Sequence, residues 1–391
     1  PSCICQARAE NPIKEKGGCM MFADNQRISR RQLKRQFVLS LVGIFLLFQA
    51  GEIASGGGNS VAGMVIGLGF LVLYLFFLVR ASAAYGNLEK YFGCIGKWLI
   101  SLVYLSFLVL SGSFLLEKIS FLTERYLLTG VPLPLISAVF ILAAGLGMGN
   151  EVQRRGRLSE ISFPWVIGIL VLLLIFAAFH LHAPDFSLME PWSAETVAEG
   201  AYQYFTVGTS VSLAAFLLSR VDKGSRTEKG GTFRSLLHGL LLASAILLAA
   251  VVILLGVYGF AGVRDREFPI LDLMAGTGLP GGFLKRFDIV WLAVLVFSLL
   301  FSLGSILFYG CWLVGRNGRK RDWTRLILAG LIWLGSLIDW QGKKVSDIYV
   351  TLLQDIYAPL FLLITALALW AQRRFRSEKT KPQSAESGAK E

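Results

Sequence analysis

The chain has 391 residues, of which 54% are hydrophobic and only 16% are charged, and its mean hydropathy is +0.61. Soluble domains carry about 25% charged residues, so the composition excludes an ordinary water-soluble domain. The formal net charge is +12, which in a soluble protein would suggest nucleic-acid binding. No basic face joins an aromatic reading surface in this sequence, so we expect no nucleic-acid partner.

Ten charge-poor, apolar stretches follow one another along the chain. A helix that crosses a membrane needs about 20 mainly apolar residues. The first stretch begins at residue 37 and runs into residues 51–55. The other nine cover residues 61–79, 98–116, 133–148, 161–179, 201–218, 236–258, 289–312, 326–338 and 353–370. The sequence therefore predicts an all-α integral membrane protein with ten transmembrane helices, surrounded by a lipid bilayer.

Lysine and arginine concentrate in every second loop and near the two ends of this apolar region. Cytoplasmic loops carry such an excess, so we expect a multi-pass protein of the cell membrane with both termini in the cytoplasm. We expect three parts: a basic cytoplasmic tail at residues 1–36, a ten-helix permease domain at 37–372 and a disordered tail at 373–391. Met20 would make a natural start, so residues 1–19 are interpreted as an upstream extension or a fragment scar.

Neither the cysteines nor the glycine-rich motif indicates an enzyme. The N-terminal tail holds a Cys-x-Cys pair and one distant cysteine without a suitably spaced fourth zinc ligand. Cys94 and Cys311 lie at predicted cytoplasmic helix ends, where disulfides are disfavoured. The glycines at 145, 147 and 149 end a membrane helix and precede no phosphate-binding turn. We therefore expect free thiols, and no catalytic residue, metal or cofactor.

Ten spans suggest two halves of five, and an odd number of spans inverts the second half relative to the first. Transporters of this kind often carry broken helices at matching positions, around a site at mid-membrane. The matching first and sixth spans each hold a central glycine, Gly43 and Gly208. Unwinding there would free N–H groups for a carboxylate and carbonyls for an ammonium, so an amino acid is the natural guest. Alternatively, both glycines allow close packing of unbroken helices, and the sequence leaves both interpretations open.

Other polar and small residues in the spans extend this hypothesis. Glu52 and Asp355 are candidate ion-coupling carboxylates, because an intramembrane acid is a functional hypothesis by default; each is alternatively an interfacial residue. Gly63 and Gly67 form a small-xxx-small pair that we interpret as a helix-packing contact. Four hydroxyl side chains follow one another on the sixth span, and these are Thr206, Thr209, Ser210 and Ser212.

Three stretches resemble one known family. Residues 28–33, Ile-Ser-Arg-Arg-Gln-Leu, resemble its opening motif, and residues 43–47 resemble the glycine-then-apolar segment of a broken first helix. Residues 268–271 followed by 282–288 resemble its aromatic-proline run and the Phe-Leu-x-Arg motif that opens the eighth span. The chain thus resembles the spore-germination permeases, the multi-span subunit of nutrient germinant receptors, within the amino acid–polyamine–organocation transporter superfamily.

The resemblance implies a LeuT-like fold of two inverted five-helix repeats, with helices 1 and 6 broken around a small-molecule pocket. It implies ligand contacts at Val42, Gly43 and Ile44 of the first helix and at Gly208 and Thr209 of the sixth. We add Phe205 and Ser210 of the sixth span as further candidate contacts, Ser210 because its hydroxyl can bind a polar guest. The implied partners are a nutrient, an amino acid by preference, and other receptor subunits, namely a soluble-domain membrane subunit and a lipoprotein of the spore inner membrane.

One departure from the family pattern bears on function. The carboxylate common just after the sixth-helix glycine is missing, and Thr209 and Ser210 occupy that region. Ligand identity and cation coupling therefore stay open. An ion-coupled secondary amino acid transporter is the alternative to a receptor subunit, and a scaffold with a vestigial pocket is the third hypothesis.

Overall fold

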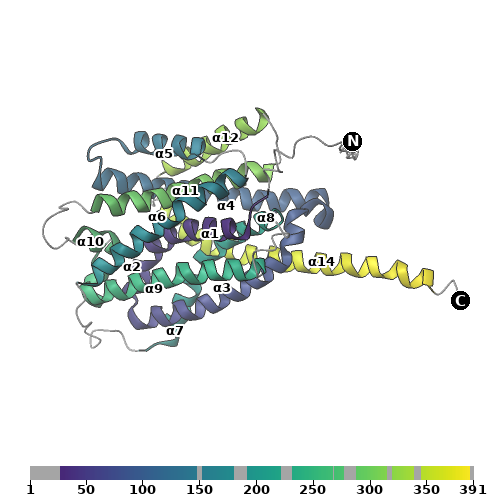
Figure 1. The fold of residues 1–391 in the computed structure, drawn as a ribbon, viewed down its shortest axis with the longest axis horizontal. Coiled ribbons are helices and arrows are strands. Elements are labelled where there is room, and N and C mark those ends of the chain that lie inside the picture. Colours follow the sequence, from purple (N-terminus) through teal and green to yellow (C-terminus); the bar gives the residue numbers. More distant parts are fainter. Residues whose placement is uncertain are drawn as a thin grey trace.

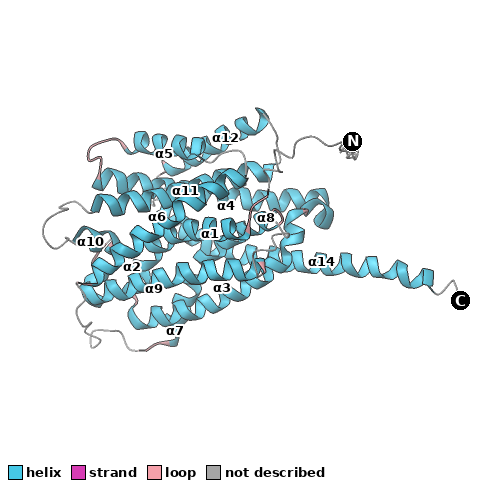
Figure 2. Cartoon of the chain, viewed as in Figure 1, coloured by secondary structure: helices cyan, strands magenta, loops and turns pink. Residues whose placement is uncertain are grey.

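The computed structural model describes residues 27–147, 152–179, 192–221, 231–266, 268–276, 288–314, 319–338 and 345–387. Within these ranges the chain is helical, and extended pairing is limited to one isolated bridge between Ile28 and Val221 (Figure 2). The predicted all-α class is confirmed. The N-terminal cysteines and most of the motif at residues 282–288 lie outside the described ranges.

The helical segments coincide with all ten predicted apolar stretches. In chain order they are α1 (Arg30–Ile44), the π-helical η1 (Phe45–Gln49), α2 (Ala50–Ser55), α3 (Gly57–Gly86), α4 (Leu88–Tyr126), α5 (Leu133–Gly147), α6 (Val152–Ala178), α7 (Ala194–Gly208), the 3₁₀-helical η3 (Thr209–Leu213), α8 (Ala214–Leu218), α9 (Thr232–Arg264), α10 (Pro269–Gly276), α11 (Asp288–Val314), α12 (Arg319–Ser336), α13 (Val345–Leu352), the π-helical η4 (Leu353–Tyr357) and α14 (Ala358–Ser387).

Six helices in the described ranges are long and apolar enough to cross a membrane. They are Gly57–Gly86, Leu88–Tyr126, Val152–Ala178, Thr232–Arg264, Ile289–Val314 and Ile348–Phe375. Helix α5 is apolar but shorter. The chain is therefore a multi-pass membrane protein.

The long helices lie side by side in one elongated bundle, with α5 and α12 at one edge and α7 at the opposite edge (Figure 1). Helix α1 packs against α6, α9 and α11, and α4 packs against α11 and α12. More than half of the α1 side chains are buried, on all sides of the helix. A helix with this pattern belongs in the interior of a bundle, so α1 is positioned to line any central site.

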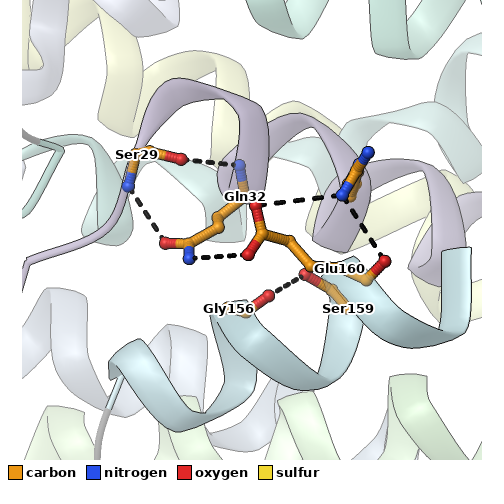
Figure 3. Close-up of polar contacts among 6 residues, drawn as sticks. Ser29, Gln32, Gly156, Ser159 and Glu160 are labelled. Atoms are coloured by element: carbon orange, nitrogen blue, oxygen red, sulfur yellow. Dashed lines mark hydrogen bonds and ion pairs between the residues drawn. The ribbon is translucent and has the colours of Figure 1, made fainter. Parts of the chain in front are cut away.

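The start of α1 extends into the segment predicted as a tail. The helix begins at Arg30, seven residues before Phe37. Ser29 accepts a hydrogen bond from the Gln32 backbone N–H at 3.1 Å, and the Ser29 N–H donates to Gln32 Oε1 at 3.1 Å (Figure 3). This reciprocal capping box satisfies two N–H groups that a helix start leaves unpaired. The Ser-x-x-Gln spacing that forms it is visible in the sequence.

The same helix start is tied to α6. Gln32 Nε2 donates to Glu160 Oε2 at 3.3 Å, and Arg35 Nη1 lies 3.8 Å from Glu160 Oε1 (Figure 3). A Cβ added at Gly156 would lie 2.9 Å from Gln32 Oε1, so the two helices approach closely here. The segment that the sequence assigned to a tail is thus an integral part of the bundle.

The other end of the chain also differs from expectation. Helix α14 continues through Ser387 and extends past the rest of the bundle (Figure 1), where the sequence predicted a disordered tail from Arg373. Residues 373–387 are rich in Arg, Lys, Glu and Gln, which have high helix propensity. Pro382 is the one residue of this segment that opposes a helix interior. Polar composition means that this segment cannot form an apolar core of its own. A single helix can still form without such a core.

The glycine pair of α3 packs as predicted. A Cβ on Gly63 would lie 2.6 Å from the Val197 carbonyl oxygen and 2.8 Å from the Ala201 nitrogen. A Cβ on Gly67 would lie 2.6 Å from the Ala201 carbonyl oxygen. Small residues let membrane helices approach to this distance, and the backbone of α7 occupies the space that larger side chains would need.

Candidate functional site

A cavity of about 90 Å³ lies between α1, α4, η3–α8, α11 and α13. One water needs roughly 10–15 Å³ of such space, so the cavity has room for a small molecule or a few waters. Its lining residues come from five separate parts of the chain, and these are Leu33, Gln36, Phe37, Ser40, Leu41, Ile44, Phe107, Ser111, Phe114, Leu115, Ser210, Val211, Leu213, Ala214, Leu217, Ser302, Ser305, Ile306, Tyr309 and Tyr349.

The cavity wall is apolar with scattered neutral polar groups. Among the described residues that line it, none carries a formal charge. Gln36 is only 6% exposed, and its Nε2 has no hydrogen-bond partner. Ser302 donates to the Ser40 carbonyl oxygen at 3.1 Å, which joins α11 to α1 beside the cavity. A guest here would meet oriented hydroxyl and amide groups in an otherwise dry environment.

Two of the residues predicted as ligand contacts line this cavity, namely Ile44 and Ser210. The Ser210 hydroxyl donates to the Val207 carbonyl oxygen at 2.9 Å. Val42 is buried in the helix bundle, and Phe205 makes an edge-to-face contact with Tyr74 at 6.1 Å between ring centroids. The structure therefore brings part of the predicted set to one place and leaves the rest in packing contacts.

Gly43 lies at a contact between α1 and α11. A Cβ added there would lie 2.6 Å from Ser298 Oγ and 3.4 Å from Leu299 Cδ2. The Ser298 hydroxyl donates to the Leu39 carbonyl oxygen at 2.7 Å, one turn before Gly43. This geometry agrees with the close-packing interpretation that the sequence left open for Gly43.

Gly208 and Thr209 lie at a second contact, between the α7–η3 junction and α3. A Cβ on Gly208 would collide with the Leu71 side chain, and the buried Thr209 hydroxyl donates to the Thr206 carbonyl oxygen at 2.6 Å. Replacing Gly208 with leucine would therefore disturb α3 as well as any ligand, so it is a poor test of ligand binding.

The two segments predicted to be broken change helix type instead of unwinding. The chain is π-helical at η1 and 3₁₀-helical at η3, with right-handed helical backbone angles at Ile44, Gln49, Gly208 and Thr209. The N–H groups at these junctions stay bonded: that of Phe45 donates to the Leu41 and Val42 carbonyls. Freed backbone groups of the expected kind are therefore not seen at these residues, although π segments recur at functional sites.

The two candidate coupling acids lie away from the cavity. Glu52 is exposed on α2, and Asp355 is exposed on η4. Neither side chain lines the cavity between α1 and η3–α8. Their coupling role therefore stays a prediction.

A residue that the sequence assigned to a loop is buried beside the cavity. Arg155 belongs to α6 and is 5% exposed. It donates to Ser305 Oγ, on the cavity wall, and to the Phe301 carbonyl oxygen at 3.5 Å. The position of Arg155 in a basic cluster before an apolar stretch favoured a loop, because the sequence does not reveal that α6 begins at Val152 and turns this side chain inward.

The fold and the cavity define the class of protein. A computed comparison with solved structures finds MhsT in complex with L-phenylalanine, with a TM-score of 0.66 and 17% identity, over 88% of this chain and 90% of that chain. Mhp1, a nucleobase-cation-symport-1 family transporter in a closed conformation, follows with a TM-score of 0.54 and 15% identity, over 84% and 75%. The chain is a membrane protein with the LeuT-type transporter fold.

Sequence comparison gives the family. The model of the spore permease family, described as "Spore germination protein", matches residues 27–317. Spore germination protein YndE of Bacillus subtilis (strain 168) is 20% identical over 289 residues, or 71% of this chain and 77% of that protein. Spore germination protein A2 of the same strain is 24% identical over 307 residues, or 74% and 80%. The chain belongs to the spore germination protein family, a permease-like family and not an enzyme class.

Proposed function

We propose that this chain is the membrane-embedded subunit of a nutrient germinant receptor. It binds a small nutrient, an amino acid by preference, in the cavity between α1 and η3–α8. Binding changes how these helices pack, and the change passes to a soluble-domain membrane subunit and a lipoprotein in the spore inner membrane. The observation that carries this proposal is a small cavity, lined by residues of the first and sixth predicted spans, in a spore germination protein.

We further propose ten membrane crossings, two inverted five-helix repeats and cytoplasmic termini. In support, helical residues coincide with all ten apolar stretches, and η1 and η3 occupy corresponding places in the two halves. A membrane-impermeant maleimide should label Thr129→Cys but not Arg154→Cys in intact cells, in a background without native cysteines. The reverse labelling pattern would exclude this orientation.

Filling the cavity should abolish the nutrient response without removing the protein. Ala214 lines the cavity and is buried, so Ala214→Leu places three extra carbon atoms where the guest would lie. We expect at least a tenfold higher nutrient concentration for half-maximal germination, with an unchanged amount of protein in the membrane. Ala143→Leu, on the exposed face of α5, is the matched control. An unchanged response of Ala214→Leu spores would show that the guest binds elsewhere.

Ion-coupled transport is the second candidate function, favoured by the likeness to transporter structures over most of the chain. It differs from sensing in one measurable respect. Purified chain in proteoliposomes should accumulate labelled amino acids under a proton or sodium gradient if it is a transporter. Binding without gradient-driven accumulation would support a receptor that senses its nutrient.

A further inference from the structure

Arg155 is a buried cation for which the described residues provide no carboxylate partner. Its guanidinium donates to Ser305 and Phe301, and it lies over the Phe301 ring at 4.9 Å and the Phe308 ring at 5.5 Å from the ring centroids. The ion pairs of the described residues do not include it. The rings and neutral acceptors hold the charge in place without cancelling it.

A charge in this position is costly unless a counter-charge accompanies it. Buried ionised groups in proteins are paired or hydrogen-bonded to compensate lost hydration, and arginine within a membrane domain marks a functional site by default. A guest with one negative charge near Ser305 would balance the site. A guest with a positive group there would meet repulsion in a low-dielectric surrounding.

The cavity wall offers a hydrogen-bond donor that the described residues do not use. Gln36 lines the cavity from α1, is 94% buried, and its Nε2 has no partner among the described residues. Ser305 lines the cavity from α11, accepts from Arg155 and donates its own hydroxyl hydrogen to the Phe301 carbonyl oxygen at 2.8 Å. A carboxylate can accept from Gln36 Nε2, since it offers about four lone pairs and no donor.

The rest of the wall determines what the carboxylate is attached to. Leu41 and Ile44 of α1 and Phe107 and Leu115 of α4 also line the cavity. These side chains suit a small apolar body. No acidic residue among the described lining residues is available for an ammonium group.

We propose that the cavity recognises its guest chiefly by one carboxylate, which accepts a hydrogen bond from Gln36 Nε2 and is attracted by the charge of Arg155 behind Ser305. The guest class is small monocarboxylates with an apolar body, which includes apolar amino acids. Arg155 acts through Ser305 and is a positioning residue. This inference rests on the proposed function, because it names the group by which the nutrient is held.

Matched acids and amides test the inference. The probes are L-alanine and L-alaninamide, L-valine and L-valinamide, and propionate and propionamide, titrated calorimetrically into the purified full chain in nanodiscs. The wild-type chain should bind each acid at least about tenfold more tightly than its amide, because hydrogen bonds to charged groups are stronger than neutral ones. Arg155→Gln should bring the two affinities within about threefold, whereas Arg155→Lys should retain the preference.

Two further variants separate charge recognition from folding. Arg154→Gln removes a neighbouring exposed cation of α6 and should leave the acid-to-amide ratio unchanged. Gln36→Met removes the unpartnered donor at similar volume and should weaken acid binding several-fold, which tests the site even if Arg155→Gln does not fold.

Equal binding of acid and amide by the wild-type chain, or a preference that survives in Arg155→Gln, would overturn the inference. Binding of glucose or inosine without binding of any carboxylate would also overturn it. In that case nutrient binding in the cavity would still stand, because Ala214→Leu would still abolish it.

Discussion

Replacing Gly63 or Gly67 with leucine should prevent the chain from accumulating as a folded membrane protein. At each position the added side chain would collide with backbone atoms of α7, at 2.6 Å from a carbonyl oxygen. A backbone cannot rotate aside as a side chain can, so α3 and α7 would have to separate along their whole contact. Overpacking typically costs about 1–3 kcal/mol and sometimes more, and we expect the upper end here.

Gly69→Leu is the matched control, because nothing lies within 4 Å of a Cβ at Gly69 on the same helix. Size-exclusion chromatography of a fluorescently tagged chain should give a monodisperse peak for Gly69→Leu and an aggregated profile for Gly63→Leu. Identical profiles for the two variants would contradict the close contact between α3 and α7.

Thr365→Val should destabilise the bundle by about 1–3 kcal/mol, the cost of removing a shared acceptor from buried donors. The Thr365 hydroxyl lies 3.1 Å from the Tyr85 hydroxyl and 3.4 Å from the Tyr74 hydroxyl, and all three residues are buried. Tyr85 also lies 3.2 Å from the Tyr104 hydroxyl. This network joins α14 to α3 and α4, so its loss should loosen the packing of the last helix.

Thr365→Ser keeps the hydroxyl and is the control for this substitution. Thermal unfolding in detergent should show a lower midpoint for Thr365→Val than for Thr365→Ser. A valine variant as stable as the serine variant would mean that the hydroxyl network contributes nothing measurable, as happens for some interhelical hydrogen bonds in membranes.

The close approach of α3 and α7 could be predicted from the sequence because it depends on a local pattern. Two glycines four residues apart lie on one face of a helix, and in an apolar stretch they mark a contact whatever the partner. The Ser-x-x-Gln pattern at Ser29 is equally local. It marks the start of α1 at Arg30, although the apolar stretch that predicts this helix begins only at Phe37. In the polar segment after Arg373, by contrast, composition predicted a disordered tail, whereas the structure continues α14 through Ser387. Polar composition alone does not tell whether a segment forms a helix.

The candidate site could be predicted only in part. Ile44 and Ser210 line the cavity, and both lie in the central segments of the first and sixth spans that correspond in the two halves. Gly43 and Gly208 were indistinguishable from ligand contacts in the sequence, since both packing and binding favour glycine. Their neighbours Ser298 and Leu71 lie far away in the chain, and no local pattern links them.

The sequence by itself determined that this chain is a helical membrane protein, where the apolar parts of its helices lie and to which family it belongs. These properties follow from hydropathy, glycine spacing and short motifs, all of which act over a few residues. Tertiary structure alone decided that Arg155 is buried, that Gln36 faces a cavity without a partner and that Glu52 and Asp355 remain exposed. Burial of a polar side chain depends on which helix covers it, and that is settled only when distant segments pack together.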